Sequence, residues 1–425
     1  MYYDLTRGKI SRSLILFALP MIAGNLLQQF YNIADTLIVG RVLGSNALAA
    51  VGSSYTLMTF LTSIFLGLSM GAGALFSIYQ GRKDLSSLKL SILHAFLLIL
   101  AVTLVLNLAV YAGIEPILTF LRVPDEVRPG MRTYLLIIFA GLIATSVYNF
   151  FSCMLRALGN SSVPLIFLAV SAVLNIALDL LFVAVLPFGI AGAALATVLA
   201  QYVSAVGILL YVLLRCRMWL PSKKEWRFSH SILKEILNLS SMTCIQQSVM
   251  NFGILMVQGL VNSFGPAVMA AFAAAVKIDT FAYLPVQDFG NAYSTFTAQN
   301  YGAGNHERIR RGTKDAFALS AAFSIVISLL VNLFAHPLMQ IFVKASEMEV
   351  IAIGVQYLRL EGSFYRHRMA VSAVRVLPRC QTRRDVGCSD RHFAWHACGA
   401  GIPFLRHGAW RCRNLDRHSD RLGTG

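Results

Sequence analysis

Uninterrupted apolar stretches of about 20 residues recur along most of this chain, and each is long enough to cross a hydrocarbon core roughly 30 Å thick as a helix. Of the 425 residues, 56% are hydrophobic and only 13% are charged, well below the charged fraction of a typical soluble domain. The apolar runs are continuous and do not alternate with polar residues, which excludes an outer-membrane barrel as well as the soluble fold classes. The sequence therefore predicts an all-α polytopic membrane protein.

Hydropathy predicts ten helices before residue 366. A polar, basic linker at residues 215–233 divides them into an N-terminal domain at residues 1–214 and a C-terminal domain at residues 234–365. The predicted helices cover residues 13–39, 47–79, 90–113, 133–155, 163–187, 189–214, 234–262, 267–299, 315–335 and 349–365.

Alternate loops between these helices are rich in Lys and Arg, as is typical of the cytoplasmic side of a membrane protein. One side receives the basic groups at Arg7, Arg82, Arg156, Arg215 and Arg308, while the opposite loops carry few basic residues. We therefore expect the N-terminus to be cytoplasmic. The net charge of +16 reports membrane orientation, together with a basic tail, and does not indicate a nucleic-acid partner.

The two halves of the chain resemble repeats of one another at an offset of 221 residues. At this offset the segment Gly44 to Ala50 aligns with Gly265 to Ala271, and Tyr79-Gln80-Gly81 aligns with Asn300-Tyr301-Gly302. A basic loop follows both members of the second pair. With an even number of spans in each half, both halves would enter the membrane from the same side, a construction common among secondary transporters. The pattern favours two pseudo-symmetric bundles.

Several motifs of polar and small residues interrupt the apolar runs. They are Leu19-Pro20, Gln28 to Thr36, Gly44 to Gly52, Arg156 to Asn160, Asn175 with Asp179, and Gln299 to Gly304. Together these motifs resemble those of the multidrug and toxic compound extrusion (MATE) transporters, in their bacterial drug/cation antiporter form, over residues 1–365. The resemblance implies twelve membrane helices in two six-helix bundles around a central cavity, in a multi-pass protein of the bacterial inner membrane.

The resemblance also implies a function. Such transporters work by alternating access and export amphipathic, often cationic small molecules against an inward flow of H⁺ or Na⁺. The expected partners are these substrates and the surrounding membrane lipids, with no nucleic acid, and no cofactor is expected besides the coupling ion. We expect no enzyme activity. The run Gly67-Leu68-Ser69-Met70-Gly71 matches the nucleophile elbow of serine hydrolases, but that motif needs a strand-turn-helix setting, and here the two glycines indicate close helix packing.

Asp35 stands in an apolar helix, where an ionised carboxylate costs roughly 2.5–3.5 kcal/mol. A carboxyl group in such a setting can take up a proton near neutral pH or stay ionised and hold Na⁺, and either event neutralises the site. Asp179 lies at a similar depth in another predicted helix, and Asn175 precedes it by one turn on the same face. The resemblance adds Thr197 and assigns all four residues to an ion-coupling network. The alternatives are a solvated Asp35 at a helix end and ordinary interhelical hydrogen bonds from Asn175 and Thr197.

Pro20 removes a backbone hydrogen bond from the first predicted helix and bends it. The resemblance makes this bend a hinge, and a static bend is the alternative. In the second half, five polar residues are candidates to line the cavity. They are Gln246, Gln247, Lys277, Asp279 and Asp288. Two of these, the glutamines, stand where some family members carry an acid, which argues against a second ion site there. No metal site is expected other than one for Na⁺ at Asp35 and Asp179.

Two other functions are possible. A lipid-linked saccharide flippase of the same superfamily should carry cationic residues in its cavity, and the scarcity of Arg in the first two predicted helices argues against it. A non-transporting membrane receptor or a membrane-embedded enzyme is disfavoured by the repeat and by the absence of a catalytic constellation. No Walker A sequence is present, so ATP is not expected to be the direct energy source.

The composition changes abruptly at residue 366. Residues 366–425 hold 12 Arg and 4 Asp, which is half of the net charge, along with five of the nine His and four of the seven Cys. The apolar periodicity of the membrane helices stops at the same point. We expect this tail to come from a shifted reading frame, and the spacing of its His and Cys residues matches no standard zinc finger.

Overall fold

The computed structural model describes residues 3–120, 125–222, 225–262, 266–343 and 347–360. Within these ranges the chain is helical, with no strand, which confirms the predicted fold class. Six of the helices are long and apolar enough to cross a membrane, or seven when one bent pair is counted as a single span, among the residues described. The expectations for the tail at 366–425 lie outside the described residues.

The first half of the chain contains helices α1 to α8 and a π-helical turn, η1. Their bounds are α1 Ile10–Leu43, α2 Ser45–Arg82, α3 Leu85–Ala112, α4 Ile114–Phe120, α5 Arg128–Ala140, α6 Leu142–Ala157, α7 Ser162–Asp179, η1 Leu180–Val185 and α8 Gly189–Arg215. Asp84 caps α3, since its side chain accepts a hydrogen bond from the backbone N–H of Ser87 at 3.0 Å.

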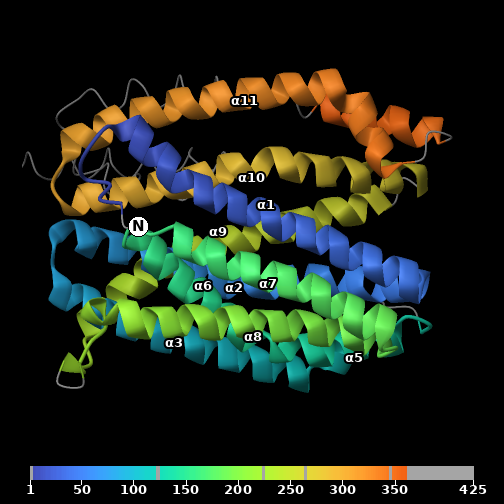
Figure 1. The fold of residues 1–425 in the computed structure, drawn as a ribbon, viewed down its shortest axis with the longest axis horizontal. Coiled ribbons are helices and arrows are strands. Elements are labelled where there is room, and N and C mark those ends of the chain that lie inside the picture. Colours follow the sequence, from blue (N-terminus) through green and yellow to red (C-terminus); the bar gives the residue numbers. More distant parts are fainter. Residues whose placement is uncertain (1–2, 121–124, 223–224, 263–265, 344–346, 361–425) are drawn as a thin grey trace, which may run out of the picture.

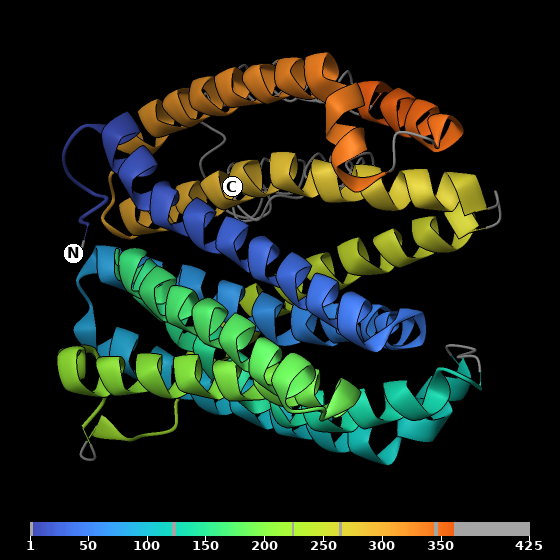
Figure 2. The same ribbon diagram turned by 45° about the vertical axis from the view of Figure 1, so that its right-hand side comes forward.

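The linker and the second half follow. A short 3₁₀ turn, η2, covers Arg217–Trp219; the long helices are α9 His230–Asn262, α10 Pro266–Gly302 and α11 His306–Phe342, and residues 348–360 are also helical. The linker is held to α3 by Lys89, which lies 3.1 Å from Glu225, and by His94, whose Nε2 accepts the backbone N–H of Ser229 at 3.0 Å. Figures 1 and 2 show α10 and α11 on one side of the molecule and α3, α5 and α8 on the other, with α9 crossing between the two sides.

Two predicted helices are interrupted in the structure. The span predicted as one helix at 133–155 is the bent pair α5 and α6, whose axes meet at 44°. The bend lies at Gly141, where a Cβ atom would overlap the side-chain oxygen of Gln201 on α8. The span predicted at 163–187 is α7 followed by the π turn. The stretch from Glu115 to Arg132, predicted as a loop, contains the short helix α4.

Helix α1 is shared between the two halves. Its first turns pack into an apolar cluster with α10 and α11, in which Phe17 and Phe296 are fully buried. Further along, Gly24 lies against Leu165 and Leu168 of α7. Both figures show α1 running obliquely across the other helices between the two sides of the molecule. Pro20 lies within this helix, which is continuous from Ile10 to Leu43.

Helix α2 makes the closest contact with the second half. A Cβ atom on Gly67 would lie 2.6 Å from the Cα of Cys244 on α9, and one on Gly71 would overlap Ser240. Glycine at these positions lets the two backbones approach, as small residues do in membrane helix pairs. Ser69, between them, is fully buried and donates to the carbonyl oxygen of Phe65. The two glycines thus have the packing role expected from the sequence. Ser69 lies within a helix and not in the strand-turn-helix setting of a nucleophile elbow.

Candidate ion-coupling site

Asp35 and Asp179 meet where α1 passes the end of α7. Asp179 is the last residue of α7, directly before the π turn η1, and is fully buried, whereas Asp35 is half-buried. Their carboxyl groups lie close enough to interact electrostatically with one another. π-Helical turns are rare in proteins, and many of those that occur lie at functional sites. The two acids therefore form one carboxyl pair in the apolar interior of the first half.

Asn175 and Thr197 extend this pair to α8. Asn175 is buried one turn before Asp179, and its Nδ2 donates to the hydroxyl oxygen of Thr197 at 3.3 Å. The hydrogen bond uses the amide nitrogen and leaves the amide oxygen without a donor among the described residues. The structure thus brings together all four residues that were expected to form the network, from α1, α7 and α8.

Four oxygen atoms of this site have no hydrogen-bond donor among the described residues. They are Oδ1 of Asp35, Oδ1 of Asn175 and both carboxylate oxygens of Asp179. Buried oxygen atoms normally find a donor or a cation, because leaving them unpaired is costly. Carboxylate and amide oxygens are ligands for hard cations, and two adjacent carboxylates can also share one proton. The arrangement can therefore hold either a cation or a proton.

Two tyrosines stand next to the carboxyl pair and were not expected from the sequence. Tyr31 lies one turn before Asp35 on α1, and Tyr134 comes from α5; both lie close enough to Asp35 for electrostatic interaction. Their hydroxyl groups are donors that a carboxylate can use. Tyr31 was visible as part of a motif in the first helix, but nothing in the sequence indicated that Tyr134 would reach the same place.

The candidate residues of the second half do not form one cluster. Gln247 is buried and its amide contacts the sulfur of Met70 on α2, and Lys277 is exposed on α10. Asp288 lies eleven residues after Lys277, about 16 Å further along the helix at 1.5 Å per residue. Gln246 and Asp279 are both half-buried.

Asp288 has a specific partner across the molecule. It is 1% exposed, and the Nδ2 of Asn25 on α1 donates to both of its carboxylate oxygens at 2.7 and 2.8 Å. Arg156, at the end of α6, also interacts electrostatically with this carboxyl group. Asn25, a polar residue within the apolar run of α1, was not among the residues expected at the site. The hydrogen bond joins α1 to α10, and so joins the two halves of the chain.

A bundle of long apolar helices with a carboxyl pair between them is the architecture of a polytopic membrane protein. The family model described as MatE matches residues 20–181 and 240–365, and the chain belongs to this family of multidrug transporters. It is 34% identical over 366 residues to the "Probable multidrug resistance protein YpnP" of Bacillus subtilis (strain 168), covering 85% of this chain and 81% of the relative.

Further relatives and solved structures agree. The chain is 26% identical over 360 residues to the "Probable multidrug resistance protein NorM" of Thermotoga maritima, covering 84% of this chain and 77% of that protein. It superposes with a TM-score of 0.80 and 23% identity on an outward-facing MATE family transporter of the MOP superfamily, over 85% of this chain and 80% of the other. A MOP superfamily transporter from Pyrococcus furiosus has the same TM-score at 22% identity, over 85% of this chain and 80% of that chain. These structures share the fold, which confirms the expected class, an all-α polytopic membrane protein.

Proposed function

We propose that this protein exports amphipathic, cationic small molecules by antiport with H⁺ or Na⁺, and that Asp35 and Asp179 bind the coupling ion with Asn175 and Thr197. The proposal rests on one observation: four oxygen atoms at the carboxyl pair accept no hydrogen bond from the described residues. A site of this kind is neutralised when it binds a proton or a sodium ion. Substrate binding can then depend on whether the ion is bound.

The substrate class rests on the relatives. Proteins named as multidrug resistance or multidrug export proteins match most of this chain. A relative from Shewanella oneidensis, 24% identical over 354 residues, is named "FAD transporter", so the same fold also serves a larger anionic molecule. The carboxyl pair favours a cationic substrate here, because a cation and the coupling ion would compete for the same negative charge.

The membrane orientation follows from the charges at one end of the molecule. We define the basic end as the end that carries Arg7, Arg82, Lys83, Arg308 and Arg311, where α1 begins and α2 and α10 finish. The proposal places this end in the cytoplasm of a bacterial inner membrane, since cytoplasmic loops carry the excess of Lys and Arg. It also keeps residues 1–214 and 234–365 as two bundles joined by the linker at 215–233, with Pro20 as the hinge of α1.

Transport by the full chain in proteoliposomes tests the proposal. The vesicles are given either a proton gradient or a sodium gradient, and the movement of ethidium, a permanently cationic dye, is followed by fluorescence. We expect dye movement under one of the two gradients, together with dye-dependent flow of that ion in the opposite direction. Dye that stays in place under both gradients would overturn antiport of cations, and movement of a lipid-linked saccharide in its place would favour the flippase.

A further inference from the structure

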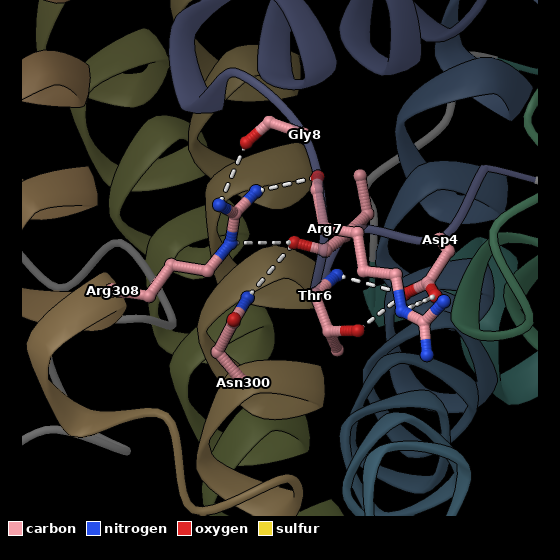
Figure 3. Close-up of polar contacts among 7 residues, drawn as sticks. Asp4, Thr6, Arg7, Gly8, Asn300 and Arg308 are labelled. Carbon is pink, nitrogen blue, oxygen red and sulfur yellow. Dashed lines mark hydrogen bonds and ion pairs between the residues drawn. The ribbon is translucent and has the colours of Figure 1, made fainter.

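We propose that Arg308 and the N-terminal segment, residues 3–9, form a latch that holds the two halves of the transporter together at the basic end. The segment precedes α1 and lies between the end of α6, in the first half, and the first turn of α11, in the second half. Figure 3 shows its contacts with Arg308 and Asn300. The latch rests on the proposed function only in that the two halves of an alternating-access transporter must separate at this end.

Arg308 binds the backbone of the segment with its whole guanidinium group. Its Nη2 donates to the carbonyl oxygen of Arg7 at 2.7 Å, its Nη1 to that of Gly8 at 2.8 Å, and its Nε to that of Leu5 at 3.3 Å (Figure 3). A planar guanidinium can serve three acceptors in fixed directions, which a lysine ammonium cannot do. The contact therefore depends on the backbone conformation of the segment as well as on the positive charge of Arg308.

The position of Arg308 makes this contact more informative. Arg308 lies in the first turn of α11, which begins at His306. A positive charge at the start of a helix is disfavoured by the helix dipole. The three carbonyl oxygens compensate for that cost, so the arginine is better explained by the segment it binds than by the stability of its own helix.

Further hydrogen bonds and apolar packing hold the segment against both halves. Asn300, at the end of α10, is fully buried and donates through Nδ2 to the carbonyl oxygen of Leu5 at 3.1 Å (Figure 3). The Leu5 side chain is itself fully buried, in a cluster with Phe17 and Phe296. On the other side, the backbone N–H of Tyr3 donates to the carbonyl oxygen of Gly159 at 2.8 Å.

Gly159 is shaped for this contact. Its φ is +89°, and a Cβ atom there would overlap the carbonyl oxygen of Tyr3. The turn after α6 thus accepts the start of the segment only with glycine at this position. One end of the segment is hydrogen-bonded to the first half at Gly159, and the rest is held by Asn300 and Arg308 of the second half. Separation of the two halves at the basic end has to break one of these sets of contacts.

The distance between the two halves at the basic end tests the latch directly. Spin labels are carried on unnatural amino acids at Ser86 of α3 and Arg310 of α11, both exposed, in the otherwise full chain with its native cysteines. Pulsed electron paramagnetic resonance then gives the distance distribution in lipid nanodiscs, without substrate or ion gradient. We expect one dominant distance in the native protein. Arg308→Ala should raise the population at longer distances about tenfold or more, because three charge-assisted hydrogen bonds are lost.

Arg311→Ala is the matched control. Arg311 lies on the same helix, is exposed, and pairs with Glu307 at 3.0 Å and not with the segment, so its replacement should leave the distribution unchanged. Deletion of residues 2–8 is a second variant that removes the segment but keeps Arg308, and it should give the same long-distance population. The native distribution in both latch variants, or an equal shift in Arg311→Ala, would overturn the latch. Because the measurement needs no transport, a failure of the proposed antiport would show separately, in the vesicle assay.

Discussion

Gly81 at the end of α2 and Gly302 at the end of α10 pack reciprocally against each other's helices. A Cβ atom on Gly81 would overlap the carbonyl oxygen of Gln299, and one on Gly302 would overlap the carbonyl oxygen of Ile78. The same two atoms would lie 3.1 Å from the backbone nitrogens of Ala303 and Arg82, respectively. Each pair of equivalent residues is separated by 221 positions, which is the offset of the repeat.

This reciprocity is what a two-fold axis between α2 and α10 requires. Small residues match easily by chance in a sequence alignment, but equivalent atoms in equivalent contacts do not. The crossing supports the proposed division of the chain into two related bundles. It also makes the basic end a place where the two halves touch backbone to backbone.

A methyl group at the crossing should destabilise this contact. Gly302→Ala introduces a Cβ where the Ile78 carbonyl stands, and overpacking of this kind costs about 1–3 kcal/mol. We expect a lower midpoint of thermal unfolding in detergent. Gly290→Ala, in the same helix with nothing within 4 Å of its Cβ position, is the control and should be neutral or stabilising. Equal effects of the two variants would show that the crossing is not tightly packed.

Replacement of Asp35 by Asn should abolish gradient-driven dye efflux. The amide keeps the size of the side chain but can neither accept a proton nor offer a negative charge to Na⁺. The amount of protein in the membrane should stay as in the native chain. Asp125→Asn, an exposed acid outside the described helices, should leave efflux unchanged. Retained efflux in Asp35→Asn would contradict the assignment of this residue as the ion-coupling group.

The hydrogen bond from Asn25 to Asp288 should be measurable by a double-mutant cycle. Asn25→Val leaves a buried carboxyl group without its amide donor, which costs about 1–3 kcal/mol. Asp288→Val in the same chain removes the group that needs the donor, so the double variant should be less destabilised than the sum of the single variants. Unfolding midpoints of the three variants and the native protein check this. Strict additivity would mean that the two side chains do not stabilise each other.

The ion pairs of Glu115 should give a pH-dependent contribution to stability. Arg128 lies 2.9 Å from one carboxylate oxygen of Glu115, Arg132 lies 2.8 Å from the other, and their hydrogen bonds hold the pKa of Glu115 below its ordinary value. A carboxyl whose pKa is lowered in the folded state stabilises the fold above its unfolded pKa of about 4.3, and the effect is lost as the pH falls through the folded value.

Glu115→Gln should accordingly lower the unfolding midpoint slightly at neutral pH, and the difference from the native protein should shrink on acidification below about pH 4. High salt should shrink it as well, because the carboxylate is exposed to solvent. A difference that persists unchanged at low pH would show that charge pairing is not its cause.

The positions of most helices were predictable because hydropathy is a property of each segment. Nine of the ten predicted helices have described counterparts that begin or end within a few residues of the expected bounds. The differences are a bend within one predicted helix and a longer extent of another. The bend at Gly141 was not predictable from hydropathy, because both arms of the bent pair are apolar and the glycine packs against Gln201 of a later helix. Helix α11 begins at His306 and not at residue 315, because its first turns are charged and hydropathy does not mark them as part of a span.

The sequence by itself determined that this chain is a helical membrane protein, where its apolar spans lie, and that acids such as Asp35 and Asp179 need compensation. The tertiary structure alone decided which polar groups meet: Asp35 lies beside Asp179, Asn25 donates to Asp288, and Arg308 donates to the backbone before α1. The physical reason is that apolar burial depends on the composition of a single segment. A buried polar atom, in contrast, is satisfied by a partner whose place depends on how distant helices pack.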